Sequence, residues 1–171
     1  MTNKEILEIA LEQSAVDCSC SAEDFLQAEN RVVLSKPHRN ARKYLPLPLE
    51  CDLVSYGNNI VAQVSERLAG IVSVYIEKYP VEHCFETPNI NALNDSLAAY
   101  DLKVCFMAEY FLPDLTQLKE LPCEFETRVL HKGDFSDLYT EEWSNALSSE
   151  NRGFDVLGVG AYDHGRLIGL A

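Results

Sequence analysis

Apolar residues recur at helical spacing in three stretches of the chain. The longest stripe follows Ser65 and repeats every three or four residues until Pro80, which has no backbone N–H with which to continue a helix. Its members are Leu68, Ile71, Val72, Tyr75, Ile76 and Tyr79. A Thr-x-x-Glu capping box at Thr2 begins another helix, and Thr87 followed by Pro88 begins a third. The pattern therefore predicts helices over residues 3–16, 66–79 and 88–97, with a short helix around residues 25–26.

Short β-branched and apolar runs predict strands between and after these helices. The turn residues Gly57-Asn58-Asn59 join two of them into a hairpin, and residues 163–166 join the last two. The predicted strands span residues 31–35, 52–56, 60–64, 83–86, 104–111, 125–130, 156–162 and 167–170, and short helical turns are predicted at 134–138 and 141–147. The order is ααβββα(β)αβ followed by βααββ. This order predicts an α/β protein of the mixed α+β kind.

Two lobes are predicted from the same pattern. Residues 113–123 are bounded by Pro113 and Pro122 and read as a linker. The first lobe then covers residues 1–112, and the second covers residues 124–171 and ends on an apolar strand.

Composition narrows the classes of function. A formal net charge of -13 argues against a general nucleic-acid binder, which would need Lys and Arg to neutralise phosphates. No run of about 18 apolar residues predicts a membrane span, and residues 1–15 lack the continuous apolar stretch of a signal peptide. The six cysteines are therefore expected to be reduced thiols in the cytoplasm. None forms the Cys-x-x-Cys pair of a zinc site, so no metal is expected.

The stretch from Phe125 to Ala171 (FETRVLHKGDFSDLYTEEWSNAL…FDVLGVGAYDHGRLIGLA) resembles the opening of a lobe of the GNAT superfamily of N-acetyltransferases. Such lobes begin with a strand, two helices and a strand hairpin. The resemblance implies that a fourth strand and a Gly-rich loop follow, whose backbone N–H groups hold the pyrophosphate of acetyl-CoA at a helix N-terminus. This sequence stops before that loop.

The earlier part of the chain resembles a second, degenerate GNAT copy with a central mixed sheet flanked by helices. At the place of the phosphate loop, VSERLAGIV offers only Arg67 and Gly70. The glycines that would let backbone approach a phosphate without a Cβ clash are missing. We therefore expect no cofactor in this chain, although the resemblance implies acetyl-CoA for the intact parent.

The resemblance also suggests where an amine acceptor would bind. Tyr139, Glu141, Glu142 and Trp143 lie where GNAT relatives place their acceptor-binding helices. Carboxylates would pair with an amine, and an aromatic ring would hold a cation. The competing interpretation is that Trp143 packs in the core while the two glutamates face water. No catalytic residue is predicted.

Other patterns have simpler interpretations. Gly158-Val159-Gly160 lies inside a predicted strand, which favours close packing of the backbone over a nucleotide loop. His83, Cys84 and Glu86 are reactive types, but neighbours on a strand point to opposite faces. The basic run of Lys36, His38, Arg39, Arg42 and Lys43 favours a solvated loop over an anion site.

Three functions are compatible with these residues. The first is the N-terminal portion of a GNAT-like N-acetyltransferase, inactive on its own. The second is a non-catalytic ligand-binding or dimerisation module, and the third is a thiol enzyme that uses Cys84 or Cys105. The unpaired edge of the hairpin at residues 155–171 predicts a homo-oligomer or packing against the first lobe.

Overall fold

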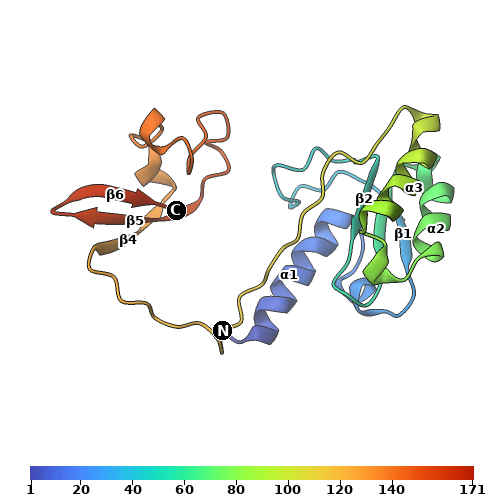
Figure 1. Ribbon diagram of the computed structural model, residues 1–171, viewed down its shortest axis with the longest axis horizontal. Helices are drawn as coiled ribbons and strands as arrows, with labels where there is room; N and C mark the ends of the chain where they lie inside the picture. Colours follow the sequence, from blue (N-terminus) through green and yellow to red (C-terminus); the bar gives the residue numbers. More distant parts are fainter. The chain divides into compact units, whose positions relative to one another are not determined.

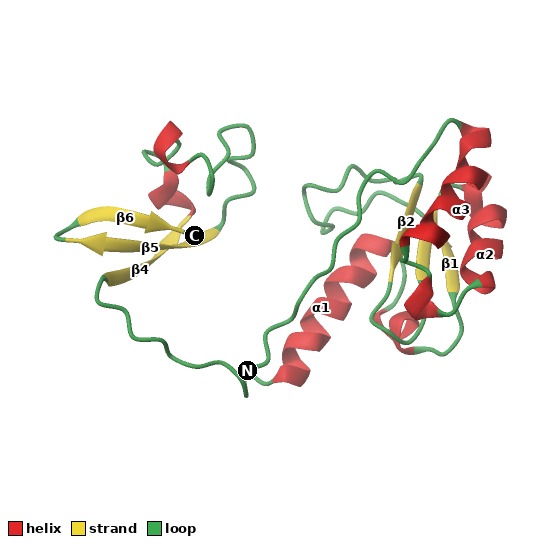
Figure 2. Ribbon diagram, in the orientation of Figure 1, coloured by secondary structure: helices red, strands yellow, loops and turns green.

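The computed structural model describes residues 1–171 and divides into two compact units, Met1–Leu118 and Lys119–Ala171 (Figure 1). The division falls inside the predicted linker at residues 113–123. The chain is a mixed α+β protein with three α-helices and two three-stranded sheets (Figure 2). Short 3-10 turns and loops lie between these elements. All three α-helices lie in the first unit. No helix is both long and apolar enough to cross a bilayer.

The first unit is built on a sheet with the strand order β1-β3-β2. The strands are β1 (Arg31–Leu34), β2 (Cys51–Val54) and β3 (Val61–Val64). β2 and β3 are antiparallel and form the predicted hairpin, whereas β1 pairs with β3 in parallel. β3 is buried along its whole length, as expected for a central strand with helices on both faces.

Helix α1 (Asn3–Cys18) covers one face of this sheet, and α2 (Ala69–Lys78) and α3 (Thr87–Leu97) cover the other. Alternate residues of β3 serve the two faces. Val61 packs with Leu11 and Phe25 on the α1 side, while Ala62 and Val64 join the cluster of α2 and α3. The side chain of Phe25 is buried and meets the ring of Tyr56 edge-on at 5.2 Å.

The capping chemistry predicted for α1 is confirmed. Thr2 Oγ1 accepts from the backbone N–H of Glu5 at 3.2 Å, and Glu5 Oε2 accepts from the Thr2 N–H at 2.6 Å. These reciprocal bonds satisfy two donors that the first helical turn leaves unpaired. The helix ends at Ser19, whose φ of 59° is left-handed.

Two predicted strands of the first unit are wrong. Residue 83 ends a 3-10 turn at Val81–His83, in which the His83 N–H reaches the Pro80 carbonyl at 2.9 Å, and residues 84–86 continue as a turn. Residues 104–111 form no strand, because no other strand lies beside them to complete a ladder. An alternating sequence indicates that a segment can be a strand, but a strand exists only with its partner.

The second unit is a meander of β4 (Glu126–His131), β5 (Leu157–Asp163) and β6 (Arg166–Leu170). Both pairings are antiparallel. Between β4 and β5, the two predicted helical stretches are 3-10 turns at Lys132–Phe135 and Glu141–Trp143. A small core of Leu130, Phe135 and Leu147 holds these turns on the sheet.

The glycines of β5 allow close packing. A Cβ at Gly158 would lie 2.9 Å from the carbonyl oxygen of Ala171 and 3.2 Å from the Phe135 ring, and a Cβ at Gly160 would meet Leu167 at 2.9 Å. Gly158 therefore allows the close backbone approach that its position inside a strand predicts, whereas Gly160 leaves room for side chains.

Candidate functional site

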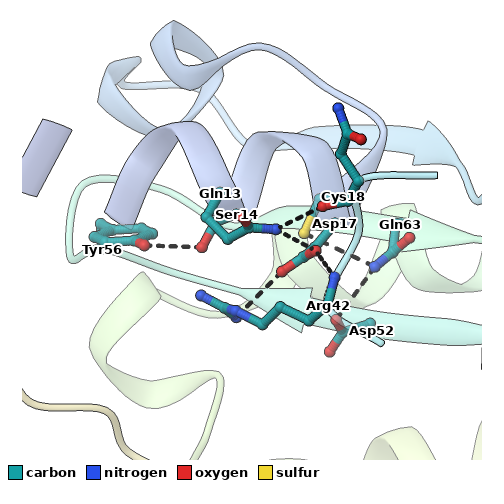
Figure 3. Close-up of polar contacts among 9 residues, drawn as sticks. Gln13, Ser14, Asp17, Cys18, Arg42, Asp52, Tyr56 and Gln63 are labelled. Atoms are coloured by element: carbon teal, nitrogen blue, oxygen red, sulfur yellow. Dashed lines mark hydrogen bonds and ion pairs between the residues drawn. The ribbon is translucent and has the colours of Figure 1, made fainter. Parts of the chain in front are cut away.

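A polar cluster lies between α1 and the sheet, and three of its members, Asp17, Cys18 and Gln63, are buried (Figure 3). We call Asp17, Cys18, Arg42, Asp52 and Gln63 the buried polar cluster. Asp17 is in the last turn of α1 and is 3% exposed. Its Oδ1 accepts from the backbone N–H of Arg42 at 2.8 Å, and its Oδ2 lies 3.2 Å from Arg42 Nη1. Arg42 therefore attaches the basic loop to α1 with both its backbone and its guanidinium.

Gln63, on the central strand β3, makes the other polar contacts beneath α1. Its Nε2 donates to Asp52 Oδ2 at 3.3 Å and lies 3.8 Å from Cys18 Sγ, and its Oε1 accepts from Ser35 Oγ at 3.0 Å. The amide is thus used at both ends, as a buried amide must be to avoid a desolvation penalty. Figure 3 shows the side chains of Cys18, Asp52 and Gln63 pointing toward one another beneath the helix.

Burial raises the pKa values of the groups around Gln63. It raises the pKa of the Asp52 carboxyl, and the negative charge of Asp17 adds to this rise while the bond from Gln63 opposes it. It also raises the pKa of the Cys18 thiol, with the charge of Asp52 as the next cause, and that of Cys51 to about 12. Since the thiolate is the nucleophile, these thiols are inert at neutral pH. The cluster therefore holds elements together and has no nucleophile to offer.

The second candidate region surrounds Tyr139 in the second unit. Its Oη donates to Asp155 Oδ2 at 2.8 Å, and the guanidinium of Arg152 lies 4.4 Å from the centre of its ring. Burial, followed by the bond to Asp155, raises the pKa of the phenol. We call Tyr139, Arg152 and Asp155 the Tyr139 cluster. Arg152 and Asp155 come from the loop before β5, and no sequence motif marks either residue.

The other predicted acceptor residues lie apart from these contacts. Glu141 and Glu142 are exposed on the 3-10 turn, and Glu142 Oε1 is 4.0 Å from Arg166 Nη2. Trp143 is half-buried. The carboxylate next to the Tyr139 ring is therefore that of Asp155, and neither of the two glutamates contacts the ring.

The reactive residues at 83–86 form no nucleophile–base pair. His83 Nδ1 lies 2.8 Å from Glu86 Oε1, which raises the pKa of the histidine. Cys84 is buried, its Sγ lies 3.5 Å from the Tyr79 carbonyl, and burial raises its pKa. The remaining thiol of that hypothesis, Cys105, is exposed on coil. The geometry at Cys84 gives no support to a thiol enzyme.

The start of α2 corresponds to the phosphate loop of the resemblance. Before it, Arg67 is paired with Glu50, through Nε at 3.1 Å from Oε2, and Glu66 adds a second carboxylate. A Cβ on Gly70 would meet nothing within 4 Å, so no close backbone approach depends on this glycine. Two carboxylates and a committed arginine do not fit a pyrophosphate.

The basic run is dispersed in the structure. Arg42 belongs to the buried polar cluster, whereas Lys36, His38, Arg39 and Lys43 are exposed. Lys36 borders a shallow hollow of about 340 Å³ together with Glu50 and Glu66. No His, Cys, Asp and Glu side chains are grouped in a way that could hold a metal ion.

Comparison with known proteins adds no relative to this geometry. No family model, no curated protein and no solved structure matches the chain.

Proposed function

We propose that the second unit, Lys119–Ala171, is the acceptor-binding opening of a GNAT-like N-acetyltransferase lobe. The intact parent would transfer an acetyl group from acetyl-CoA to an amine. Two features support this proposal: the order of strand, two helical turns and strand hairpin, and the antiparallel meander in which they pair. Both agree with what the resemblance of residues 125–171 implies.

The Tyr139 cluster is the observation that carries the proposal. An aromatic face with a carboxylate at its edge is suited to a cationic amine, because the ring quadrupole and the carboxylate attract the same charge. The Arg152 guanidinium, 4.4 Å from the ring centre, already occupies such a position. Arg152 is exposed, so an incoming amine can displace it into water.

In the intact parent, the amine nitrogen would attack the thioester carbonyl of acetyl-CoA, forming an N–C bond as the C–S bond breaks, and the proton given up by the nitrogen would pass to the departing CoA thiolate. The attacking amine must be neutral, so a proton has to leave the nitrogen first. Acetyl-CoA supplies the acetyl group when it is bound. The residues of this chain contribute the binding and orientation of the amine, and we assign no catalytic base.

The first unit fits the second hypothesis, a non-catalytic module. The residues before α2 do not suit the pyrophosphate of acetyl-CoA, as Glu50 and Glu66 show. We expect titration calorimetry of the chain with acetyl-CoA to give no binding tighter than about millimolar, an affinity of about 4 kcal/mol. Tighter binding would contradict this assignment of the first unit. A cytoplasmic location, in keeping with six free thiols, belongs to the same proposal.

The single tryptophan gives a direct assay for the acceptor site. Trp143 lies four residues from Tyr139, so its fluorescence reports on this region. We expect spermidine, a flexible cationic amine, to change the fluorescence in a saturable way, and a neutral polyether of similar length to leave it unchanged.

Two variants refine the spermidine assay. Asp155→Asn removes the carboxylate and should weaken spermidine binding at least about tenfold, because a hydrogen bond to a charged group contributes about 1.5–3 kcal/mol and each 1.4 kcal/mol is a factor of ten. Glu141→Gln removes an exposed charge outside the Tyr139 cluster and serves as the control. Equal effects of the two substitutions would indicate general charge attraction and overturn the site.

A further inference from the structure

The segment between α3 and the second unit leaves its backbone unpaired. We call residues 103–112 the free segment. The Val104 N–H donates to Asn94 Oδ1 at 2.7 Å, and no backbone-to-backbone hydrogen bond reaches any residue of the segment. Figure 1 draws it as extended coil after α3. Unpaired N–H and C=O groups in an extended chain are a template for strand pairing.

The free segment is held near both of its ends. At one end Val104 is bound to Asn94 and packs on the core of α2 and α3. Just beyond the other end, the Asn3 side chain of α1 donates to Asp114 Oδ1 at 2.6 Å and accepts from the Leu115 N–H at 2.8 Å. A segment fixed in this way loses less entropy when it pairs than a free peptide would.

The side chains of the free segment are apolar and exposed. Phe106, Tyr110 and Phe111 are 74%, 73% and 84% exposed, and Met107 and Leu112 are also open to solvent. Exposed aromatic and aliphatic side chains beside an unpaired backbone mark an edge that can pair with another chain.

The charges of the free segment select a partner. Its only charged residues are Lys103 and Glu109, and both are exposed. In a two-fold antiparallel pair, one central residue faces the same residue of the other chain. A residue a given number of positions before the centre faces the residue the same number of positions after the centre in the other chain. If Phe106 is that residue, Lys103 of each chain faces Glu109 of the other. A register centred on Met107 would instead place Lys103 opposite Phe111.

We propose that the free segment pairs antiparallel with the same segment of a second copy of this chain, with Phe106 facing Phe106. The even-numbered residues then form one apolar face, which continues from the core contact of Val104. The odd-numbered face carries the two Lys103–Glu109 pairs. This interface goes beyond the proposed acetyl transfer and lies in the first unit. It is separate from the predicted edge at residues 155–171.

Charge reversal tests the register. Lys103→Glu or Glu109→Lys alone places like charges opposite each other twice in the dimer and should weaken association about tenfold in sedimentation equilibrium. The double variant restores opposite charges and should return the association constant to within about twofold of the original protein. Both residues are exposed, so folding is unaffected. A double variant as weak as the single ones overturns the proposal.

Cysteine cross-linking tests the centre of the pair in the full chain. With Cys105 and Cys123 replaced by serine, Phe106→Cys should form an intermolecular disulfide on mild oxidation. Residues that face each other have Cα atoms about 4.5–5.5 Å apart, within disulfide reach. Ala108→Cys is the matched control, because its two copies would be roughly 13 Å apart along the strands.

Two further results would each overturn the proposal. One is a protein that stays monomeric in sedimentation equilibrium at up to about 100 µM. That concentration is far above the micromolar dissociation constant expected for a small interface. If the amides of such a monomer at 104–111 exchange slowly, the segment pairs within its own chain. The other is cross-linking of Ala108→Cys as efficient as that of Phe106→Cys.

Discussion

The ion pair between Asp17 and Arg42 should show a marked asymmetry on substitution. Arg42→Ala leaves the Asp17 carboxylate, whose side chain is 4% exposed, buried without a cation. Breaking a buried pair in this way costs about 3–5 kcal/mol. Asp17 keeps its bonds from the Gln13 side chain, at 3.0 Å, and from the backbone N–H of residue 42, so we expect the low end, about 3 kcal/mol.

Removal of the other partner should cost less. Asp17→Asn leaves the Arg42 guanidinium without its partner, but this side chain is 37% exposed and can be hydrated by water. Solvent screening also reduces the free energy that the ion pair contributes on this side. We expect about 1–2 kcal/mol. In the double variant no buried charge remains, so it should be more stable than Arg42→Ala alone.

Far-ultraviolet circular dichroism during urea denaturation measures this prediction, because the α-helices all lie in the first unit. Arg39→Ala, an exposed cation of the same loop, is the control and should change stability by about 0.5 kcal/mol or less. If the costs of Arg42→Ala and Asp17→Asn simply add in the double variant, the carboxylate is not a buried charge held by Arg42, and the reasoning fails.

Three other predictions concern single residues. Because the folded pKa of Asp52 is raised, the folded state binds its proton more readily than the unfolded chain does; stability should rise as pH falls from this raised pKa toward the ordinary value near 4. Asp52→Asn should reduce this rise and increase the melting temperature at neutral pH; a variant with an unchanged pH profile would show that the carboxyl is not desolvated. Gly158→Ala should destabilise the second unit by about 1–3 kcal/mol, measured by Trp143 fluorescence during denaturation, since the new Cβ would meet the Ala171 carbonyl. Gly153→Ala, whose Cβ would meet nothing within 4 Å, should have little effect. Equal effects of the two substitutions would argue against close packing at Gly158. Iodoacetamide should label the exposed Cys123 of the native protein well before the buried Cys18 and Cys84. Mass spectrometry measures the order of labelling, and early labelling of Cys18 or Cys84 would contradict their burial.

Local signals in the sequence predicted the local structure well. The capping box at Thr2, the stripe that ends at Pro80 and the turn at residues 57–59 each involve neighbours in sequence, and α1, α2 and the β2–β3 hairpin are present. The predicted strand at residues 104–111 is absent, since strand formation needs a partner that a local pattern cannot supply.

The contacts of the candidate sites were beyond sequence reasoning for a similar reason. Arg42 meets Asp17 across 25 residues, and Tyr139 meets Asp155 across 16. Such pairs depend on how a loop returns to a helix or a turn. Arg42 was one of several cations in a loop, and its contact with Asp17 could not be read from its sequence neighbours. The predicted region around Tyr139 did contain an aromatic–carboxylate pair, but with a different carboxylate.

The parallel pairing of β1 with β3 has a consequence for the order of folding. β2 and β3 are joined by a short turn, so the hairpin closes rapidly. The pairing of β1 with β3 instead closes a loop made of all the residues between them, 35–60, and is therefore slower. The attachment of the basic loop by Arg42 completes that long closure and should form after the main kinetic barrier. Arg42→Ala should therefore accelerate unfolding and leave the refolding rate nearly unchanged in a chevron plot, with a φ-value near zero. A slowed refolding arm would instead place the loop in the folding nucleus.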